Sequence, residues 1–287
     1  MGFRPPERLG RYRIGRALGR GGMGSVWAAV DDETGQSVAL KFLEASNARP
    51  ELAERLVREA KVSTLVRHPA LARVHEVIDF LDRPVLVMEL LTGETLRAWL
   101  TSEPKHPLEV AAALMLPVAE ALVSTHEAGI VHRDLKPENL FLASKTGRAP
   151  GTKTIKVLDF GIAKFVADRE GPATPLTALG TVLGTPPYMA PEQALGSGDI
   201  DERADVWALG VILYELVCGF RPLEAESKSD AIRRLLSSGI VPVEAVEPEL
   251  PLAFSALVGR MLTRRLDQRE RNLVGVVEEL RVFAASR

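Results

Sequence analysis

A glycine-rich segment, residues 18–27 (LGRGGMGSVW), lies between two runs of strand-like sequence. The run before it, RYRIGRAL, and the run after it, SVWAAVD, contain β-branched and aromatic residues, so we expect the glycines to connect two strands of a hairpin. A dinucleotide-binding loop instead joins a strand to a helix and is followed about 20 residues later by an acidic residue. The residue at that distance is Lys41. The sequence therefore argues against a dinucleotide-binding fold.

Strand-like runs dominate the chain up to about residue 91, and helical patterns dominate beyond it. The runs QSVALKFL, ARVHEVIDF and PVLVMELL favour strands, and the periodic segment 51–67 favours a helix among them. Short strands are expected around 140–142 and 155–158, and a long loop at 169–187. The other predicted helices cover 108–128, 203–218, 228–238, 251–263 and 272–285. We expect an α+β fold in which a β-rich part precedes a mostly helical part.

The composition excludes several functional classes. The formal net charge is −2, so no strong field attracts the chain to nucleic acid or to an anionic membrane. Cys218 is the single cysteine, which rules out a disulfide within the chain and fits a reducing compartment. The N-terminal residues lack the apolar core of a secretory signal, and the longest apolar run, 206–220, is too short for a membrane span. We expect no membrane segment here and a cytoplasmic location, with any membrane anchor elsewhere in a longer protein.

Six short motifs follow one another in a fixed order. They are the glycine segment, Lys41 in VALK, Glu59 in the first predicted helix, HRDLKPEN at 132–139, DFG at 159–161 and APE at 190–192. This order resembles the eukaryotic-type protein kinase family over about residues 11–283. The opening GRYRIGRALGRGGMGSVW and the run GTPPYMAPEQ look most like the bacterial Ser/Thr branch. The resemblance implies a bilobal kinase fold, with an N-terminal extension at 1–10, an N-lobe including the hinge at 11–91, and a C-lobe at 92–287.

The resemblance assigns the phosphates of ATP to groups of the N-lobe. Glycine has no Cβ, so Gly19, Gly21 and Gly24 would let the backbone approach the phosphates closely. Lys41 would hold the α- and β-phosphates, and Glu59 would pair with Lys41 and orient it. Taken alone, either charged residue would more simply lie on the surface. The other motifs favour the catalytic interpretation.

The HRDLKPEN and DFG motifs supply the expected catalytic and metal-binding groups. By resemblance, Asp134 is the base that takes the proton of the substrate hydroxyl, and Lys136 steadies the transferred phosphate. Asn139 and Asp159 provide hard oxygen ligands for Mg²⁺, or for Mn²⁺ in its place. Lys136 and, in the substrate groove, Thr185 of GTPPYMAPE both favour Ser/Thr over Tyr substrates.

Adenine needs an apolar slot, and the family register assigns one. Met88 would be the gatekeeper, and the backbone from Glu89 to Leu91 would pair with the adenine edge. The walls of the slot would be Leu18, Val26, Ala39 and Phe141. The apolar side chains of this set would be equally ordinary in a hydrophobic core, so the sequence leaves both interpretations open.

The loop after DFG is expected to carry a regulatory site. We expect Thr177 to be an activating autophosphorylation site, since Arg133 would be an unpaired cation beside the active site and Lys164 a second one, ready to bind its phosphate. Thr181 and Thr174 are competing positions. The alternative is that all three are ordinary loop threonines. Autophosphorylation between two copies would involve a homodimer.

Other matches to the family are expected to be structural. Glu192 and Arg269 match its buried ion pair, and Asp205 matches the helix acid that anchors the catalytic loop. His132 is expected to pack and hydrogen-bond rather than to act as a base or a metal ligand. The interval between HRDLKPEN and DFG is longer than usual, and we expect residues 144–153 to extend a surface hairpin.

These residues support functional hypotheses from different classes. The leading hypothesis is an ATP- and Mg²⁺-dependent protein Ser/Thr kinase that acts on protein substrates. The alternative is a non-catalytic ATP-binding scaffold, a pseudokinase. Such scaffolds usually lack the Lys, Asp or Asn of the motifs, and all three are present here. A small-molecule kinase is disfavoured because APE and the loop before it suit a peptide groove.

Overall fold

The computed structural model describes residues 3–21, 24–43, 66–81, 83–144, 153–158, 186–196, 200–223, 227–237 and 239–286. The chain divides into two compact units. The first comprises Met1–Arg67 and Leu71–Thr92, and the second comprises His68–Ala70 and Gly93–Arg287. The predicted helix at 51–67 and the predicted loop at 169–187 lie almost wholly outside the described residues.

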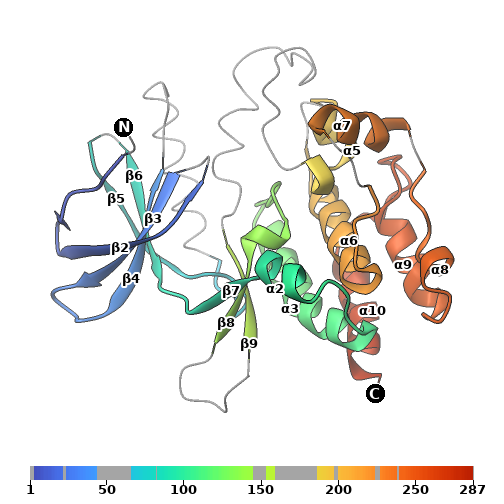
Figure 1. Cartoon of the computed structure of the whole chain (residues 1–287), viewed down its shortest axis with the longest axis horizontal. Coiled ribbons are helices and arrows are strands. Elements are labelled where there is room, and N and C mark those ends of the chain that lie inside the picture. Colours follow the sequence, from blue (N-terminus) through green and yellow to red (C-terminus); the bar gives the residue numbers. More distant parts are fainter. Residues whose placement is uncertain are drawn as a thin grey trace. The chain divides into compact units, whose positions relative to one another are not determined.

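The described part of the first unit is an antiparallel sheet with the strand order β1-β2-β3-β4-β6-β5 (Figure 1). Its strands are β1 (Arg8–Leu9), β2 (Tyr12–Gly21), β3 (Gly24–Asp31), β4 (Ser37–Leu43), β5 (Val74–Asp79) and β6 (Pro84–Glu89). Strands β2 and β3 pair antiparallel, with Gly21 opposite Gly24. The prediction that the glycine segment connects two strands of a hairpin is therefore confirmed.

The two faces of this sheet have different surroundings. Successive side chains of a strand point to opposite faces. On β4, Leu40 and Phe42 belong to a buried hydrophobic cluster together with Val85 and Val87 of β6. The intervening Lys41 points to the other face. This hydrophobic cluster therefore lies on one side of β4, and Lys41 lies on the other side together with the buried Ala39 and Leu43.

The second unit contains a three-stranded antiparallel sheet and the described helices. Its strands, in order, are β7 (Gly93–Thr95), β8 (Leu140–Ser144) and β9 (Lys153–Val157). Its helices are α2 (Leu96–Ser102), α3 (Leu108–Glu127), α5 (Pro191–Ala194), α6 (Arg203–Cys218), α7 (Lys228–Ser237), α8 (Val243–Val246), α9 (Leu252–Met261) and α10 (Val274–Ala285), with short 3₁₀ turns at Pro137–Asn139 and Pro186–Tyr188. The five predicted helices of this part match α3, α6, α7, α9 and α10 to within two residues at each end.

Helix α6 is the central helix of the second unit. Every residue from Ala204 to Cys218 is buried, and α3, α8 and α9 pack against it. Gly219 ends the helix with a φ of 81°, a left-handed conformation that glycine adopts easily. Two charged residues, Asp205 and Glu215, lie inside this buried helix. A buried charge is costly unless it is paired, so both need polar partners from neighbouring elements.

Helix α3 corrects one expectation from the sequence. With 20 residues, it is long and apolar enough to cross a membrane by length and composition, whereas residues 206–220 were expected to be the longest such run. In the structure, however, Ala111, Met115 and Leu122 of α3 are fully buried. The helix packs against α6 and α10, and α10 runs beside it in Figure 1. Helix α3 is therefore a core helix of the second unit.

Candidate active site

The HRDLKPEN segment, residues 132–139, lies between α3 and β8 in the second unit. Asp205, in the first turn of α6, is fully buried beneath it. The Asp205 carboxylate accepts hydrogen bonds from the backbone N–H groups of His132 (2.7 Å) and Arg133 (2.8 Å). It also lies 2.8 Å from Nε2 of His126 in α3. The expectation that Asp205 anchors this loop is confirmed.

The charge state of Asp205 follows from opposing effects. Burial alone would raise the pKa of this carboxyl group, because a carboxylate is costly where water is excluded. Interactions with His126 first, and with His132 second, outweigh burial, and the pKa of Asp205 lies below its ordinary value. Asp205 is therefore ionised at neutral pH and is a strong acceptor for the N–H groups of the loop.

His132 is fully buried and is bonded at both ring nitrogens. Its Nε2 lies 2.9 Å from the carbonyl oxygen of Leu158, and the N–H of Asp134 donates to its Nδ1 at 3.3 Å. A carbonyl oxygen can only accept, so a neutral ring with its proton on Nε2 satisfies both bonds. The expected packing and hydrogen-bonding role of His132 is confirmed. The bond to Leu158 also ties the loop to the residue immediately before the DFG motif.

Asp134 is buried, and two side-chain nitrogens contact its Oδ2. Lys136 Nζ lies 2.8 Å from Asp134 Oδ2. Asn139 Nδ2 donates to the backbone oxygen of Asp134 at 2.8 Å and to its Oδ2 at 3.2 Å. The structure thus brings together three of the residues that the sequence singled out. An oriented carboxylate beside an ammonium group is suited to accepting a proton from a hydroxyl next to a phosphate.

The orientation of Asn139 bears on metal binding. Because the backbone carbonyl of Asp134 can only accept, the amide nitrogen of Asn139 must face it, and Oδ1 points to the other side. A neutral amide oxygen is a hard ligand of the kind that Mg²⁺ binds. Asp159, the second expected ligand, lies outside the described residues. Within the described ranges, no three His, Cys, Asp or Glu side chains cluster in a way that would hold a metal.

In the first unit, several predicted ATP-binding residues share one face of the sheet. Lys41 lies opposite Val26 of β3, and Ala39 lies opposite Met88 of β6. Directly opposed residues of antiparallel strands point to the same face, and so do residues two apart on one strand. This face is the one opposite the hydrophobic cluster of Leu40 and its neighbours. Val26, Ala39 and Met88 therefore do not belong to that cluster, although Ala39 and Met88 are buried.

The backbone of the glycine hairpin is open at Gly19 and has a conformation that favours glycine at Gly24. Gly24 has a φ of 134°, where a side chain would be strained, and a Cβ at Gly19 would occupy open space with no atom within 4 Å. A side chain at Gly19 would fill the approach to the backbone.

At the expected hinge, the N–H of Glu89 donates to the carbonyl of Arg73 at 2.9 Å. Adenine pairing at Glu89 would thus use its carbonyl oxygen.

Comparison with known proteins identifies the family. The chain matches the protein kinase domain over residues 12–272. It belongs to the protein kinase family. It is 38% identical over 281 residues to serine/threonine-protein kinase Pkn1 of Myxococcus xanthus, a match that covers 97% of this chain and 39% of that protein. It is 37% identical over 269 residues to serine/threonine-protein kinase PknA of Mycobacterium tuberculosis, covering 92% of this chain and 59% of that protein.

Family membership confirms the expected fold class and the resemblance to bacterial Ser/Thr kinases. Several residues to which the kinase resemblance assigns roles are not among the described residues. Those of the helix and the DFG motif are Glu59 and Asp159, and those of the following loop are Lys164, Thr174, Thr177, Thr181 and Thr185. Their roles stay predictions. Leu18, exposed in β2, Leu91, and Phe141 in β8 are described, and their adenine-binding roles also stay predictions.

Arg133 differs from the expected unpaired cation. Its Nη2 donates to the backbone carbonyl of Ile200 at 3.1 Å, so its guanidinium is engaged within the second unit. The expectation failed because the sequence does not show which backbone carbonyls the fold brings to an arginine. A role of Arg133 in binding an anion stays a prediction.

The buried ion pair expected for the kinase family is present. Arg269 forms a two-bond pair with Glu192 of α5, at 2.7 Å from Nη1 to Oε1 and 2.9 Å from Nη2 to Oε2. Both side chains are buried. Arg269 also donates to the carbonyl groups of Arg203, Thr263 and Arg264. These contacts fasten α5, which follows the substrate-groove motif, to the helical body of the second unit.

Two polar clusters near the loop were missed by sequence reasoning. Arg97 of α2 bonds to Glu138 of the loop at 3.1 Å, to Glu215 of α6 at 2.9 Å, and to the hydroxyl of Tyr188. Burial raises the pKa of Tyr188, and the adjacent Glu215 carboxylate raises it further, so its hydroxyl remains a donor. The second cluster centres on Gln193 of α5. No local pattern in the sequence marks either cluster, since their members come from distant segments.

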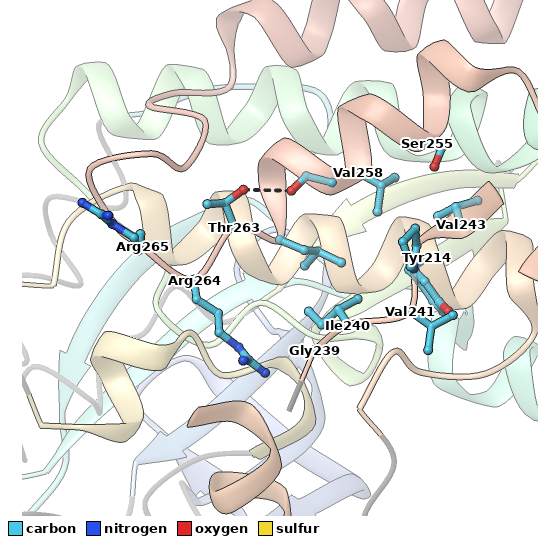
Figure 2. Close-up of a pocket in the computed structure, with 13 residues that line it drawn as sticks. Tyr214, Gly239, Ile240, Val241, Val243, Ser255, Val258, Thr263, Arg264 and Arg265 are labelled. Carbon is cyan, nitrogen blue, oxygen red and sulfur yellow. Dashed lines mark hydrogen bonds between the residues drawn. The ribbon is translucent and has the colours of Figure 1, made fainter. Parts of the chain in front are cut away.

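A cavity of about 330 Å³ lies elsewhere in the second unit (Figure 2). Its lining includes Tyr214 of α6, Val258 of α9 and the segment 239–243. Arg264 and Arg265 line it on the side away from Tyr214 in Figure 2. None of its lining residues belongs to the 132–139 loop. This cavity is separate from the candidate active site.

Proposed function

We propose that the chain is the catalytic domain of an ATP-dependent protein Ser/Thr kinase. The observation that carries the proposal is the buried carboxylate of Asp134, whose Oδ2 is contacted by both Lys136 and Asn139. A non-catalytic scaffold would have no need for this arrangement. The names of the bacterial relatives, which are serine/threonine-protein kinases, support the same assignment.

The chain's own residues would divide the reaction between them. The oxygen of the substrate hydroxyl would bond to the γ-phosphorus while the bond from that phosphorus to the leaving ADP oxygen breaks, and Asp134 would accept the hydroxyl proton. Lys136, beside Asp134, would neutralise charge on the transferred phosphoryl group. Lys41 and the backbone of the glycine hairpin would hold the other phosphates. Asn139 Oδ1 and Asp159 would hold Mg²⁺, which neutralises phosphate charge when bound.

The adenine site and the lobe boundaries are part of this proposal. The shared sheet face of Val26, Ala39 and Met88 supports an adenine-facing wall in the N-lobe. We assign residues 11–91 to the N-lobe with the hinge and 92–287 to the C-lobe. The chain spans 39% of Pkn1 and 59% of PknA, so we propose that it is one domain of a longer bacterial protein. We also propose that this longer protein phosphorylates protein substrates in the cytoplasm. Any membrane anchor would lie in a part of it outside this chain.

The test of the kinase assignment is transfer of radiolabelled γ-phosphate from ATP·Mg²⁺ to a generic basic protein. Asp134→Asn should reduce transfer by about 100- to 10,000-fold, because the proton acceptor is lost. It should bind ATP as the wild type does, measured by calorimetry. Asp267→Asn is the matched control, since Asp267 is exposed and pairs with Arg265. No transfer by the wild type would favour the scaffold.

Regulation by autophosphorylation extends the proposal. Phosphothreonine at residue 177 would carry about −1.5 to −2 charges, which Arg133 and Lys164 would bind. Transfer between two copies would pass through a transient homodimer. Mass spectrometry after incubation with ATP·Mg²⁺ should locate phosphate on Thr177 rather than Thr181 or Thr174. Full activity of Thr177→Ala after phosphatase treatment would contradict this role.

A further inference from the structure

The backbone before Asp134 has an unusual geometry. Arg133 has a φ of 61°, in the left-handed region that residues with a Cβ seldom adopt. The N–H of Asp134 donates to the carbonyl oxygen of His132, two residues earlier, at 2.8 Å. A positive φ at the middle residue together with this short bond is typical of the strained form of the γ-turn. Such a conformation persists only where surrounding contacts maintain it.

Two side chains from distant segments bond to the two peptide groups of Arg133, the middle residue of this γ-turn. Asp205 accepts the N–H of Arg133, as described above. Gln193 of α5 bonds to the peptide group that follows Arg133: its Nε2 donates to the carbonyl oxygen of Arg133 at 2.8 Å. That carbonyl and the N–H of Asp134 belong to one peptide group. The Gln193 amide therefore contacts the peptide plane that directly precedes the Asp134 side chain.

The amide of Gln193 has a single orientation. Its Oε1 accepts the N–H of Ala190 at 3.1 Å, while its Nε2 faces the carbonyl oxygen of Arg133. A backbone N–H can only donate and a carbonyl can only accept, so neither partner tolerates the flipped amide. One side chain thus joins the segment that begins α5 to the loop that carries Asp134.

We propose that Gln193 is a positioning residue that sets the direction of the Asp134 carboxylate by maintaining the γ-turn. Rotation of the peptide plane between Arg133 and Asp134 would turn the Cα–Cβ bond of Asp134 and misalign the proton acceptor. Catalytic groups must be held within fractions of an ångström, and a displacement of about 1 Å costs about 100-fold in rate. The inference rests on the proposed kinase function, because it concerns the proton acceptor of that reaction.

The test separates the two hydrogen bonds of Gln193 with near-isosteric variants. Gln193→Glu keeps an acceptor for the N–H of Ala190 but places a carboxylate oxygen against the carbonyl of Arg133. Gln193→Met removes both hydrogen bonds and keeps a side chain of similar length. Leu195→Ala, a change at an exposed position just after the same helix, is the control. The measurements are kcat, the ATP dissociation constant, the melting temperature, and hydrogen exchange of the Asp134 amide by NMR.

We expect kcat to fall by about 10- to 100-fold in both Gln193 variants, with the ATP dissociation constant unchanged. The Asp134 amide should exchange faster in both variants, and the control should match the wild type. Wild-type kcat and exchange in Gln193→Glu would overturn the inference, since only its contact with Arg133 is lost. A wild type without phosphotransfer would instead overturn the proposed function, and the exchange measurement would still decide whether Gln193 maintains the γ-turn.

Discussion

Asp205 receives hydrogen bonds from two backbone N–H groups and one histidine at a place that water does not reach. The N–H groups of His132 and Arg133 would otherwise be buried donors without acceptors, which costs about 1–3 kcal/mol each. An ionised carboxylate has enough lone pairs to serve all three donors. The conformation of the catalytic loop thus depends on a residue more than 70 positions away.

Asp205→Asn should destabilise the protein by about 3 kcal/mol at pH 7. Asparagine has one acceptor oxygen, and its NH₂ group would face a donor. Because the pKa of Asp205 is lowered in the folded state, its contribution is present above the unfolded pKa of about 3.9 and is lost as the pH falls below it. Urea unfolding should therefore show a nearly constant difference from wild type between pH 7 and pH 5, and a smaller difference at pH 3.5 and pH 3, below the unfolded pKa. A difference independent of pH would mean that Asp205 is not ionised in the fold.

At the scale of elements, helix α5 is too short to be stable by itself, and tertiary contacts hold it. Glu192 pairs with Arg269 on one side of α5, and Gln193 bonds to the catalytic loop on the other. Consecutive residues of a helix point in different directions, so a single turn can join two parts of the second unit.

Arg269→Leu should destabilise the protein by about 3–5 kcal/mol, because it leaves the Glu192 carboxylate buried without its partner. Glu192→Leu combined with Arg269→Leu should recover part of this loss, since no buried charge then remains unpaired. Thermal unfolding of the two single variants and the double variant measures the coupling. Strictly additive effects would contradict a direct ion pair.

The β8–β9 hairpin offers a test of the long interval between the HRDLKPEN and DFG motifs. Ser144 of β8 pairs with Lys153 of β9, so the two strands are already in register where the described residues end. Replacing residues 145–152 by Asn-Gly, which favours a tight hairpin turn, should leave phosphotransfer and the melting temperature unchanged. Loss of activity in a folded variant would indicate that this segment contacts a substrate or a partner.

At the scale of the whole chain, two compact units each have their own hydrophobic core. The first unit is the smaller, and a smaller unit buries a smaller fraction of its surface on folding. We therefore expect the first unit to unfold at a lower urea concentration than the second.

Tryptophan fluorescence can separate the two units. The chain has three tryptophans, of which Trp27 lies in the first unit and Trp99 and Trp207 lie in the second. In Trp27→Phe, fluorescence should follow the second unit alone, while far-UV circular dichroism follows both. The circular dichroism curve should begin to fall first. Coincident curves would show that the chain unfolds as one cooperative system.

Much of the fold was predictable from the sequence because its signals are local. The helix-forming runs of α3, α6 and α10 and the strand-like runs beside the glycines depend on neighbours a few residues apart, which the sequence displays directly. The motifs carrying Asp134, Lys136 and Asn139 lie within one octapeptide, so their proximity was also implied. The membrane-length helix α3 was not predicted as such because Glu109, Pro117 and Glu120 interrupt its apolar residues, whereas the run at 206–220 has a single charge, Glu215.

The sequence by itself determined the element types, the kinase motif order and the chemical groups available to the site. Only the tertiary structure decided which face of β4 carries Lys41 and which carries the cluster of Leu40 and Phe42, because alternation leaves the choice between two faces open. It also decided that Arg97 meets Glu215, that Ile200 engages Arg133, and that Gln193 holds the peptide before Asp134. Such contacts join segments dozens of residues apart. Their partners follow from chain packing in three dimensions, which no local pattern of residues encodes.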